Sequence, residues 1–210
     1  AVPRVHQGAW KGSKLVMASA IMELPYVPED PDTAFLARLA VQIGDMEADG
    51  IVTDLPLTLG ATVADCLPVC IRWGAWRALL HSGWQGTGII RIALEAMVPC
   101  QFSTPLKVVL GPSVSAGDYP VDAERAALFS DRFGEPAVVA DSSGRPCLAI
   151  AETNLDLIRQ WGQERCPAAS MDVVWWTTST VSSPWLHSFR RDGANFGRML
   201  VLSGEKTSYR

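Results

Sequence analysis

Two short apolar segments in the middle of the chain, residues 67–73 and 76–82, are separated by only a few residues around Gly74. Both segments have the composition of strands, and a connection this short joins strands that pair with each other. The sequence therefore predicts a β-hairpin here. The register of a hairpin determines which side chains share a face, so this hairpin also determines which of its polar residues can meet.

The hairpin carries Cys66 at its start and His81 near its end. If residues 73–74 form a two-residue turn, Cys66 faces His81. If residues 74–75 form the turn, Cys66 faces Gly83, and His81 is its diagonal neighbour on the same side. A three-residue turn points His81 to the other side. Two of the three registers thus bring the thiol and the imidazole onto one face, with their Cβ atoms roughly 5 to 8 Å apart.

A cysteine and a histidine at that distance have two chemical uses. The imidazole can take the thiol proton and create a nucleophilic thiolate, or both side chains can bind zinc. The alternative without chemistry is that Cys66 is buried as a small apolar residue and His81 is hydrogen-bonded at a strand end. Asp65, next to Cys66, either orients His81 or caps a turn.

The stretch SGWQGTG at 82–88 leads from the hairpin into a helix expected at 87–98. Free backbone N–H groups at a helix start attract anions, so Gly83 and Gly86 are candidate binding residues. The alternative is that these glycines only permit a tight turn. Trp84 either stacks on a planar ligand or packs against the helix.

Two adjacent arginines, Arg190 and Arg191, lie in the segment 187–198, where Asp192 and Gly193 follow them. A pair of guanidinium groups can hold a phosphate or a carboxylate. The alternative is that both arginines pair with acidic residues on the surface.

The rest of the chain alternates between strand and helix patterns. We expect further strands at 50–54, 59–64, 106–113, 137–141, 171–178 and 197–204, and helices at 31–43, 122–133 and 152–164. Several strands mixed with helices indicate an α/β (mixed α+β) fold with a mixed sheet and flanking helices. We expect one domain over residues 1–210, with an atypical N-terminal part at 1–30.

Composition narrows the class of protein. Hydrophobic residues make up 48% and charged residues 19%, which allows a sizeable core. A net charge of -4 argues against nucleic-acid binding, and no apolar run approaches the roughly 18 residues that cross a bilayer. The first residues lack the apolar part of a signal peptide, and five irregularly spaced cysteines do not form a disulfide framework, so we expect a cytoplasmic protein with a small-molecule substrate. The oligomeric state stays open.

Five ordered stretches resemble the laccase-domain family, whose members are also called polyphenol oxidases or purine nucleoside phosphorylases. They are ADGIVTDLP at 48–56, VADCLPVCI at 63–71, LLHSGWQGT at 79–87, GPSVSAGDYPV at 111–121 and SFRRDGANFGR at 188–198. The resemblance implies a fold shared with cysteine hydrolases that include the catalytic domain of cytotoxic necrotizing factor. It also implies one zinc held by two histidines and one cysteine, and chemistry on purine nucleosides: phosphorolysis or deamination of adenosine. A copper-dependent phenol oxidase was the older assignment for the family.

In this resemblance, Cys66 and His81 correspond to two of the three zinc ligands. In the family, the first ligand histidine lies shortly before the segment that matches 48–56. The corresponding residues of this chain, LARLAVQIGDME, contain no histidine. Either that strand has been deleted, which we favour, or His6 is a shifted remnant and the third ligand. Gln85 stands where the family has arginine, and Gly117 and Asp118 stand where a cysteine is frequent. These departures indicate altered chemistry or an altered substrate.

Three functional hypotheses follow. The first is an enzyme with a Cys66/His81 centre, assisted by Asp65, that performs hydrolysis or group transfer at a C–N or acyl bond of a small polar substrate. The second is a zinc-dependent purine nucleoside phosphorylase or adenosine deaminase. The third is a binding subunit without catalytic activity. Copper oxidation is weaker, because one sulfur and one or two imidazoles do not make a multicopper site.

Overall fold

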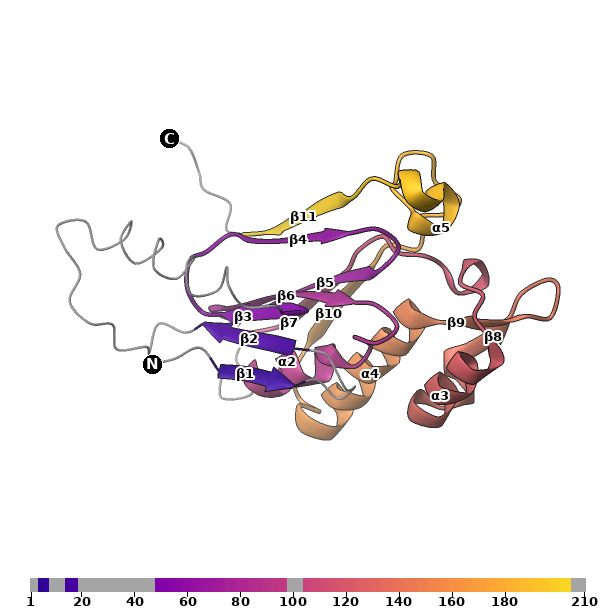
Figure 1. Ribbon diagram of the computed structural model, residues 1–210. Helices are drawn as coiled ribbons and strands as arrows, with labels where there is room; N and C mark the ends of the chain where they lie inside the picture. The colour runs from indigo at the N-terminus through magenta and orange to yellow at the C-terminus, as the bar shows by residue number, and fades with distance from the viewer. Residues whose placement is uncertain (1–3, 8–13, 19–47, 98–103, 205–210) are drawn as a thin grey trace.

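The computed structural model describes residues 4–7, 14–18, 48–97 and 104–204. At its centre lies a mixed sheet, with helices on one face and a two-stranded ribbon over part of the other face (Figure 1). The expected α/β fold with a mixed sheet and flanking helices is therefore confirmed.

The central sheet has the strand order β1-β2-β3-β6-β5-β7-β10. The β2/β3 and β7/β10 pairs are parallel, and the other neighbours are antiparallel. Its strands are β1 (Arg4–Gln7), β2 (Lys14–Ala18), β3 (Gly50–Thr53), β5 (Leu67–Trp73), β6 (Trp76–Ser82), β7 (Leu106–Leu110) and β10 (Met171–Trp175). Two smaller antiparallel pairs are β4 (Leu59–Val63) with β11 (Met199–Ser203), and β8 (Val138–Ala140) with β9 (Pro146–Leu148).

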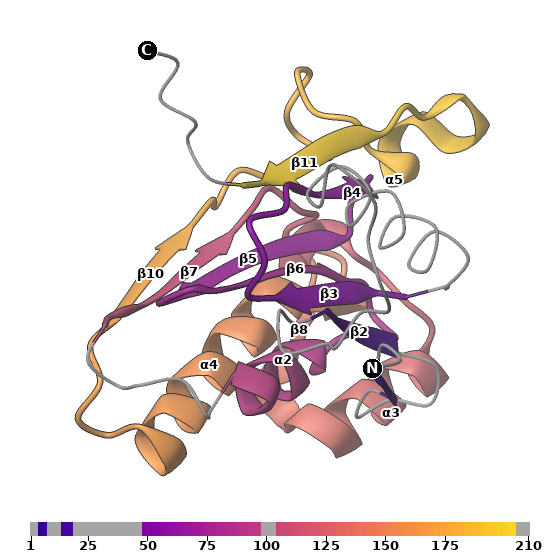
Figure 2. The same cartoon turned by 90° about the vertical axis from the view of Figure 1, so that its left-hand side faces the viewer.

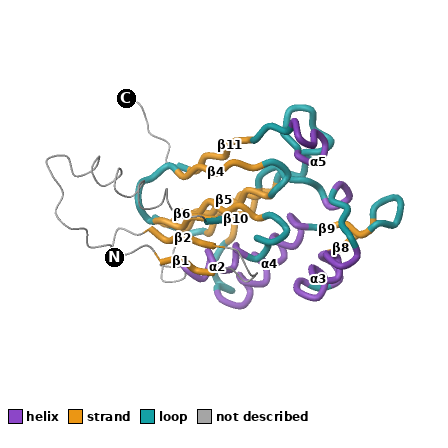
Figure 3. The backbone as a smooth tube through the Cα atoms, in the orientation of Figure 1, coloured by secondary structure: helices purple, strands orange, loops and turns teal. Residues whose placement is uncertain are grey.

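Three helices lie together under the sheet, and the short α5 lies at the opposite side, beside the β4/β11 ribbon (Figures 1 and 2). The helices are α2 (Ile89–Met97), α3 (Ala123–Phe133), α4 (Ile150–Arg165) and α5 (Phe189–Asp192). Short 3₁₀ turns occupy Ala116–Asp118, Glu135–Ala137 and Gly193–Asn195. The 3₁₀ turn Gly193–Asn195 follows α5 directly, and loops lie before α5 and after this turn (Figure 3). None of the helices in the described ranges is long and apolar enough to cross a lipid bilayer.

The side chains of β5 point alternately to the two faces of the sheet, and one of these faces packs against the main core. Leu67, Val69, Ile71 and Trp73 are buried in the main core, and Trp73 meets Trp161 of α4 edge to face with ring centroids 5.8 Å apart. Each such large apolar side chain contributes about 1.5–3 kcal/mol by its burial. The alternate residues of β5 point to the ribbon side of the sheet, because successive side chains of a strand point to opposite faces.

Most predicted elements in the described part are confirmed, with ends shifted by a few residues. The hairpin strands match at both ends, and α3 begins at Ala123, one residue after the expected start at Asp122. The Asp122 carboxylate caps this helix by accepting a hydrogen bond of 2.7 Å from the Arg125 N–H. Strands β1, β2 and β9 and helix α5 were missed, because elements of three to five residues show little periodicity. The helix expected at 31–43 lies outside the described residues.

Candidate functional site

The register of the hairpin brings Cys66 and His81 to the same place. Trp73 pairs with Trp76, so residues 74–75 form the turn and Pro68 faces His81. Cys66 then faces Gly83, and a Cβ atom added to Gly83 would lie 3.1 Å from the Cys66 Sγ. Both side chains line one pocket of about 710 Å³. Of the three registers considered for the hairpin, the structure has the one that makes His81 the diagonal neighbour of Cys66.

The pocket lies where the ends of β4 and β6 meet α5 and the first turns of α3 and α4. Aromatic rings form much of its wall, namely Trp84, Tyr119, Phe189 and Phe196. The last two form an edge-to-face pair with centroids 5.0 Å apart. Such a wall suits a planar ligand, because rings bury large apolar area and prefer stacked or edge-on contacts.

Burial controls the protonation of the two candidate reactive groups. Burial, reinforced by the neighbouring Asp65 carboxylate, raises the pKa of the Cys66 thiol to about 11. Burial also lowers the pKa of the His81 imidazole, although the Asp49 carboxylate acts in the opposite direction; Arg198 adds a smaller lowering contribution. At neutral pH the site therefore holds a protonated thiol and a neutral imidazole that can accept a proton.

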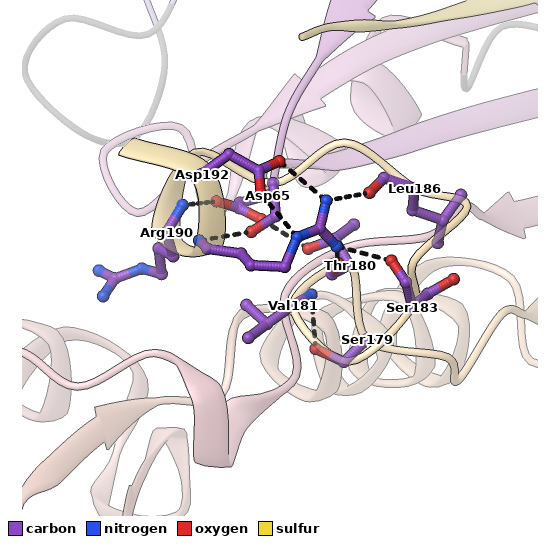
Figure 4. Close-up of polar contacts among 10 residues, drawn as sticks. Asp65, Ser179, Thr180, Val181, Ser183, Leu186, Arg190 and Asp192 are labelled. Carbon is purple, nitrogen blue, oxygen red and sulfur yellow. Dashed lines mark hydrogen bonds and ion pairs between the residues drawn. The ribbon is translucent and has the colours of Figure 1, made fainter. Parts of the chain in front are cut away.

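Asp65 holds the walls of the pocket together and does not orient His81. Its carboxylate accepts hydrogen bonds from the Thr180 hydroxyl, at 2.6 Å, and from the Arg190 N–H, at 2.8 Å (Figure 4). Its backbone has a positive φ of 73°, and its carbonyl accepts the Val114 N–H. The suggestion that Asp65 orients His81 is corrected here, because both oxygens are engaged by other segments.

The two adjacent arginines have different roles. Arg190 lines the pocket, and its guanidinium points away from the cluster of contacts around Asp65 (Figure 4). Arg191 instead donates to the carbonyls of Thr180, Ser183 and Leu186 and pairs with Asp192. Arg191 does not line the pocket, and its contacts hold the surrounding loops, so a role in substrate binding stays a prediction for Arg191.

The glycine loop is packed against the hairpin. A Cβ atom on Gly86 would lie 3.0 Å from the His81 carbonyl oxygen, and neither Gly83 nor Gly86 lines the pocket. The geometry thus agrees with the alternative in which these glycines permit a tight turn, since residues 84–88 form a turn between β6 and α2. Trp84 packs against the core and carries the Arg125 guanidinium 4.7 Å from its ring centroid.

Several residues of the pocket were not singled out from the sequence: Tyr119, Arg125, Phe189, Phe196 and Arg198. Four of them lie in the stretches 111–121 and 188–198, which carried the family resemblance. Those stretches were therefore the available signal. Arg125 had no such signal, because it follows an ordinary helix cap.

Comparison with known proteins decides the family. A family model described as multi-copper polyphenol oxidoreductase laccase matches residues 26–204. The chain belongs to this laccase family. It is 25% identical over 150 residues to a protein of Aquifex aeolicus (strain VF5) named purine nucleoside phosphorylase. These aligned residues cover 70% of this chain and 66% of that protein.

Solved structures of similar proteins share this laccase-family fold. Protein NMB0706 of Neisseria meningitidis is 29% identical, with a TM-score of 0.59 over 78% of this chain and 67% of that one. The hypothetical protein YfiH of Bacillus licheniformis, at 24% identity, gives a TM-score of 0.60 over 76% of this chain and 62% of that one. The chain thus spans less than two thirds of the length of YfiH and of the Aquifex relative.

The described residues of the pocket offer few donors to a metal ion. Cys66 and His81 supply one sulfur and one nitrogen, and no group of three His, Cys, Asp or Glu side chains within the described ranges could hold a metal ion. A catalytic zinc takes three protein ligands, and a multicopper site takes more. The described residues of this laccase-family chain therefore do not fit either metal site, and zinc stays a prediction.

The other two histidines come from other parts of the fold. His6 lies in β1, three strands away from β6 in the sheet order. His187 is exposed, and a Cβ atom on Gly197 would collide with its ring. The two alternatives, His6 as the third ligand or loss of the first ligand histidine, both stay predictions.

Proposed function

We propose that this chain is an enzyme that breaks a C–N bond of a small, planar, polar substrate by hydrolysis or group transfer, and that nucleosides are its substrate class. One observation carries the proposal: the thiol of Cys66 and the imidazole of His81 line the same pocket, whose wall is rich in aromatic rings. The name of the Aquifex relative supports nucleosides over other planar substrates.

His81 is the proton carrier in this proposal. Because its imidazole is neutral, it can accept the proton of the attacking O–H or S–H group while that group forms a bond to the substrate carbon. The C–N bond breaks as the electron pair moves to nitrogen, and His81 returns the proton to the leaving nitrogen. With an oxygen nucleophile the proton balance closes in this one step. With the Cys66 thiol the substrate carbon stays bonded to Sγ, and water must attack it in a second step, in which His81 accepts the proton of water and returns a proton to the departing sulfur. Neither route needs an external reductant or oxidant.

The protonation of Cys66 limits how its thiol can react. A thiol with a pKa of about 11 is almost fully protonated at neutral pH, so it attacks only if His81 removes its proton in the same step. Water is a weaker acid than this thiol, so it also needs His81 as a base. The raised pKa therefore argues against a preformed thiolate and makes either attacking group, thiol or oxygen, depend on His81.

The test is a turnover assay with inosine, guanosine and adenosine, each with and without phosphate, in which the released base and sugar and any deaminated product are separated by chromatography. We expect His81→Gln to lower kcat by about 10²- to 10⁴-fold, the usual contribution of general acid–base catalysis. Cys66→Ala should lower kcat less than His81→Gln if the nucleophile is an oxygen. The matched control is Cys70→Ala, since Cys70 lies in β5, which follows Cys66 directly, and does not line the pocket.

The proposal fails if His81→Gln turns over nucleosides at the wild-type rate. It also fails if the wild-type protein binds nucleosides without converting them, which would support the hypothesis of a binding subunit. Equal losses in Cys66→Ala and Cys70→Ala would remove Cys66 from the reaction.

A further inference from the structure

Three arginines from separate segments line the same pocket as Cys66 and His81. Arg125 belongs to the first turn of α3, Arg190 belongs to α5, and Arg198 directly precedes β11. These segments are far apart in the sequence, so only the fold gathers the three positive charges.

Each guanidinium is held against an aromatic ring. The distances from the guanidinium carbon to the ring centroid are 4.7 Å for Arg125 over Trp84, 3.8 Å for Arg190 over Tyr119 and 5.6 Å for Arg198 over Phe196. Stacking fixes the plane of a guanidinium while its N–H groups stay at the edge, so less side-chain freedom is lost when an anion binds.

Most of the hydrogen-bonding capacity of these arginines is unused. Arg190 donates one side-chain hydrogen bond, of 3.2 Å, to the Pro120 carbonyl, and Arg125 has a long contact of 3.8 Å with Asp122. Within the described ranges, Arg198 has no hydrogen bond or ion pair. Arg191 is the contrasting case, since its donors are taken up by three carbonyls and one carboxylate.

Two carboxylates stand against these three cations: Asp65, which lines the pocket, and Asp49, which does not line it but acts on both Cys66 and His81. Among its lining residues the only carboxylate is Asp65, and its two oxygens accept hydrogen bonds from Thr180 and from the backbone of Arg190. A pocket with three arginines and one engaged carboxylate attracts anions. The planar fork of a guanidinium matches the oxygens of a phosphate group, to which it can donate two hydrogen bonds.

We propose that Arg125, Arg190 and Arg198 form an anion subsite for a phosphate group beside Cys66 and His81. This inference rests on the proposed function, because it names the charge of a group that takes part at the same site. The phosphate group has two possible sources: free inorganic phosphate as the attacking group, or the phosphoryl group of a phosphorylated substrate such as a nucleoside monophosphate.

The test is calorimetric titration of the full chain with inorganic phosphate, with a nucleoside and with the corresponding nucleoside 5′-monophosphate. We expect Arg198→Gln and Arg125→Gln each to weaken phosphate or monophosphate binding by about 10- to 100-fold, the effect of losing a hydrogen bond to a charged group. Arg198→Lys keeps the charge without the fork and should lie between Arg198→Gln and the wild type. The control is Arg159→Gln in α4, since Arg159 is exposed, pairs with Asp156 and does not line the pocket.

The arms distinguish the two sources. Tighter binding of the monophosphate than of both the nucleoside and phosphate assigns the phosphate group to the substrate, whereas phosphate binding that the nucleoside strengthens assigns it to a free anion. Both results support the subsite if they depend on Arg125 and Arg198. No binding of either anion at about 10 mM, or binding that Arg198→Gln and Arg159→Gln leave equally unchanged, overturns it.

Binding and turnover can fail separately. Anion binding that persists in a protein without nucleoside turnover supports the subsite and overturns the proposed function alone. Normal kinetics in Arg125→Gln and Arg198→Gln, both for nucleoside with inorganic phosphate and for the nucleoside monophosphate, overturn the subsite alone. Circular dichroism and thermal unfolding of each variant verify that the fold is intact before the titration.

Discussion

Loss of the Asp65 carboxylate should destabilise the fold more than loss of any exposed acidic side chain. Asp65 is only 7% exposed, and its carboxylate joins Thr180 and the start of α5 to the segment that carries Cys66. Removing this group releases two hydrogen bonds at once and leaves a buried hydroxyl and a buried N–H without their acceptor.

The magnitude follows from the two contacts. A hydrogen bond to a charged group contributes about 1.5–3 kcal/mol, so Asp65→Ala should lower the free energy of unfolding by about 3–6 kcal/mol. The positive φ of 73° adds on the order of 1 kcal/mol, because alanine tolerates this region less well than aspartate. Asp65→Asn tolerates the same backbone and can accept from the Arg190 N–H while its amide donates to Thr180, so its cost should be about 1–3 kcal/mol.

The assay is equilibrium unfolding in urea, followed by tryptophan fluorescence. Asp131→Ala, at an exposed position of α3, is the control and should lie within about 0.5 kcal/mol of the wild type. The reasoning is refuted if Asp65→Ala and Asp131→Ala unfold at the same urea concentration, or if Asp65→Asn is as unstable as Asp65→Ala.

Four further predictions concern the site. Gly83→Ala should lower turnover, because its Cβ atom would lie 3.1 Å from the Cys66 Sγ, whereas Gly117→Ala has no atom within 4 Å and should match the wild type; steady-state kinetics of both variants decide this. Because burial lowers the pKa of His81, turnover should persist below pH 6.5 and decline at lower pH, and a pH–rate profile with its midpoint above 6.5 would contradict that. The same shift makes the unfolded chain take up the proton first, so the free energy of unfolding should fall as the pH drops below about 6.5, and urea unfolding of His81→Gln should lack this part of the pH dependence. Alkylation of Cys66 by iodoacetamide, measured by mass spectrometry of its peptide, should be slow at neutral pH and still rising near pH 10, since its thiol has a pKa of about 11; rapid labelling at pH 7 would indicate a preformed thiolate.

The hairpin is the part of the fold that the sequence predicted best. The strands 67–73 and 76–82 were placed correctly at both ends, because a short turn between two apolar segments is a local signal. The register was a different matter. Three turns fitted the same sequence, and the choice of residues 74–75 depends on how the whole hairpin pairs with β3 and β7 on either side.

Residues that are adjacent in the sequence can have different roles, because the fold gives each of them different surroundings. Arg190 and Arg191 are adjacent and chemically identical, yet one lines the pocket and the other holds three loop carbonyls. Asp65 adjoins Cys66, yet its carboxylate binds Thr180 and Arg190. Side-chain direction and long-range partners separate these pairs, and neither can be obtained from residue type.

The amino-acid order alone was enough for the mixed α/β class, the positions of most strands and helices, and the candidate pair of Cys66 and His81. These follow from periodicity, turn length and composition, which act over a few residues. Three-dimensional packing was needed to select the register, to give Asp65 its two distant partners and to gather Arg125, Arg190 and Arg198 around one cavity. Contacts of that kind join residues as many as 125 positions apart, and their energies exist only once the chain has folded.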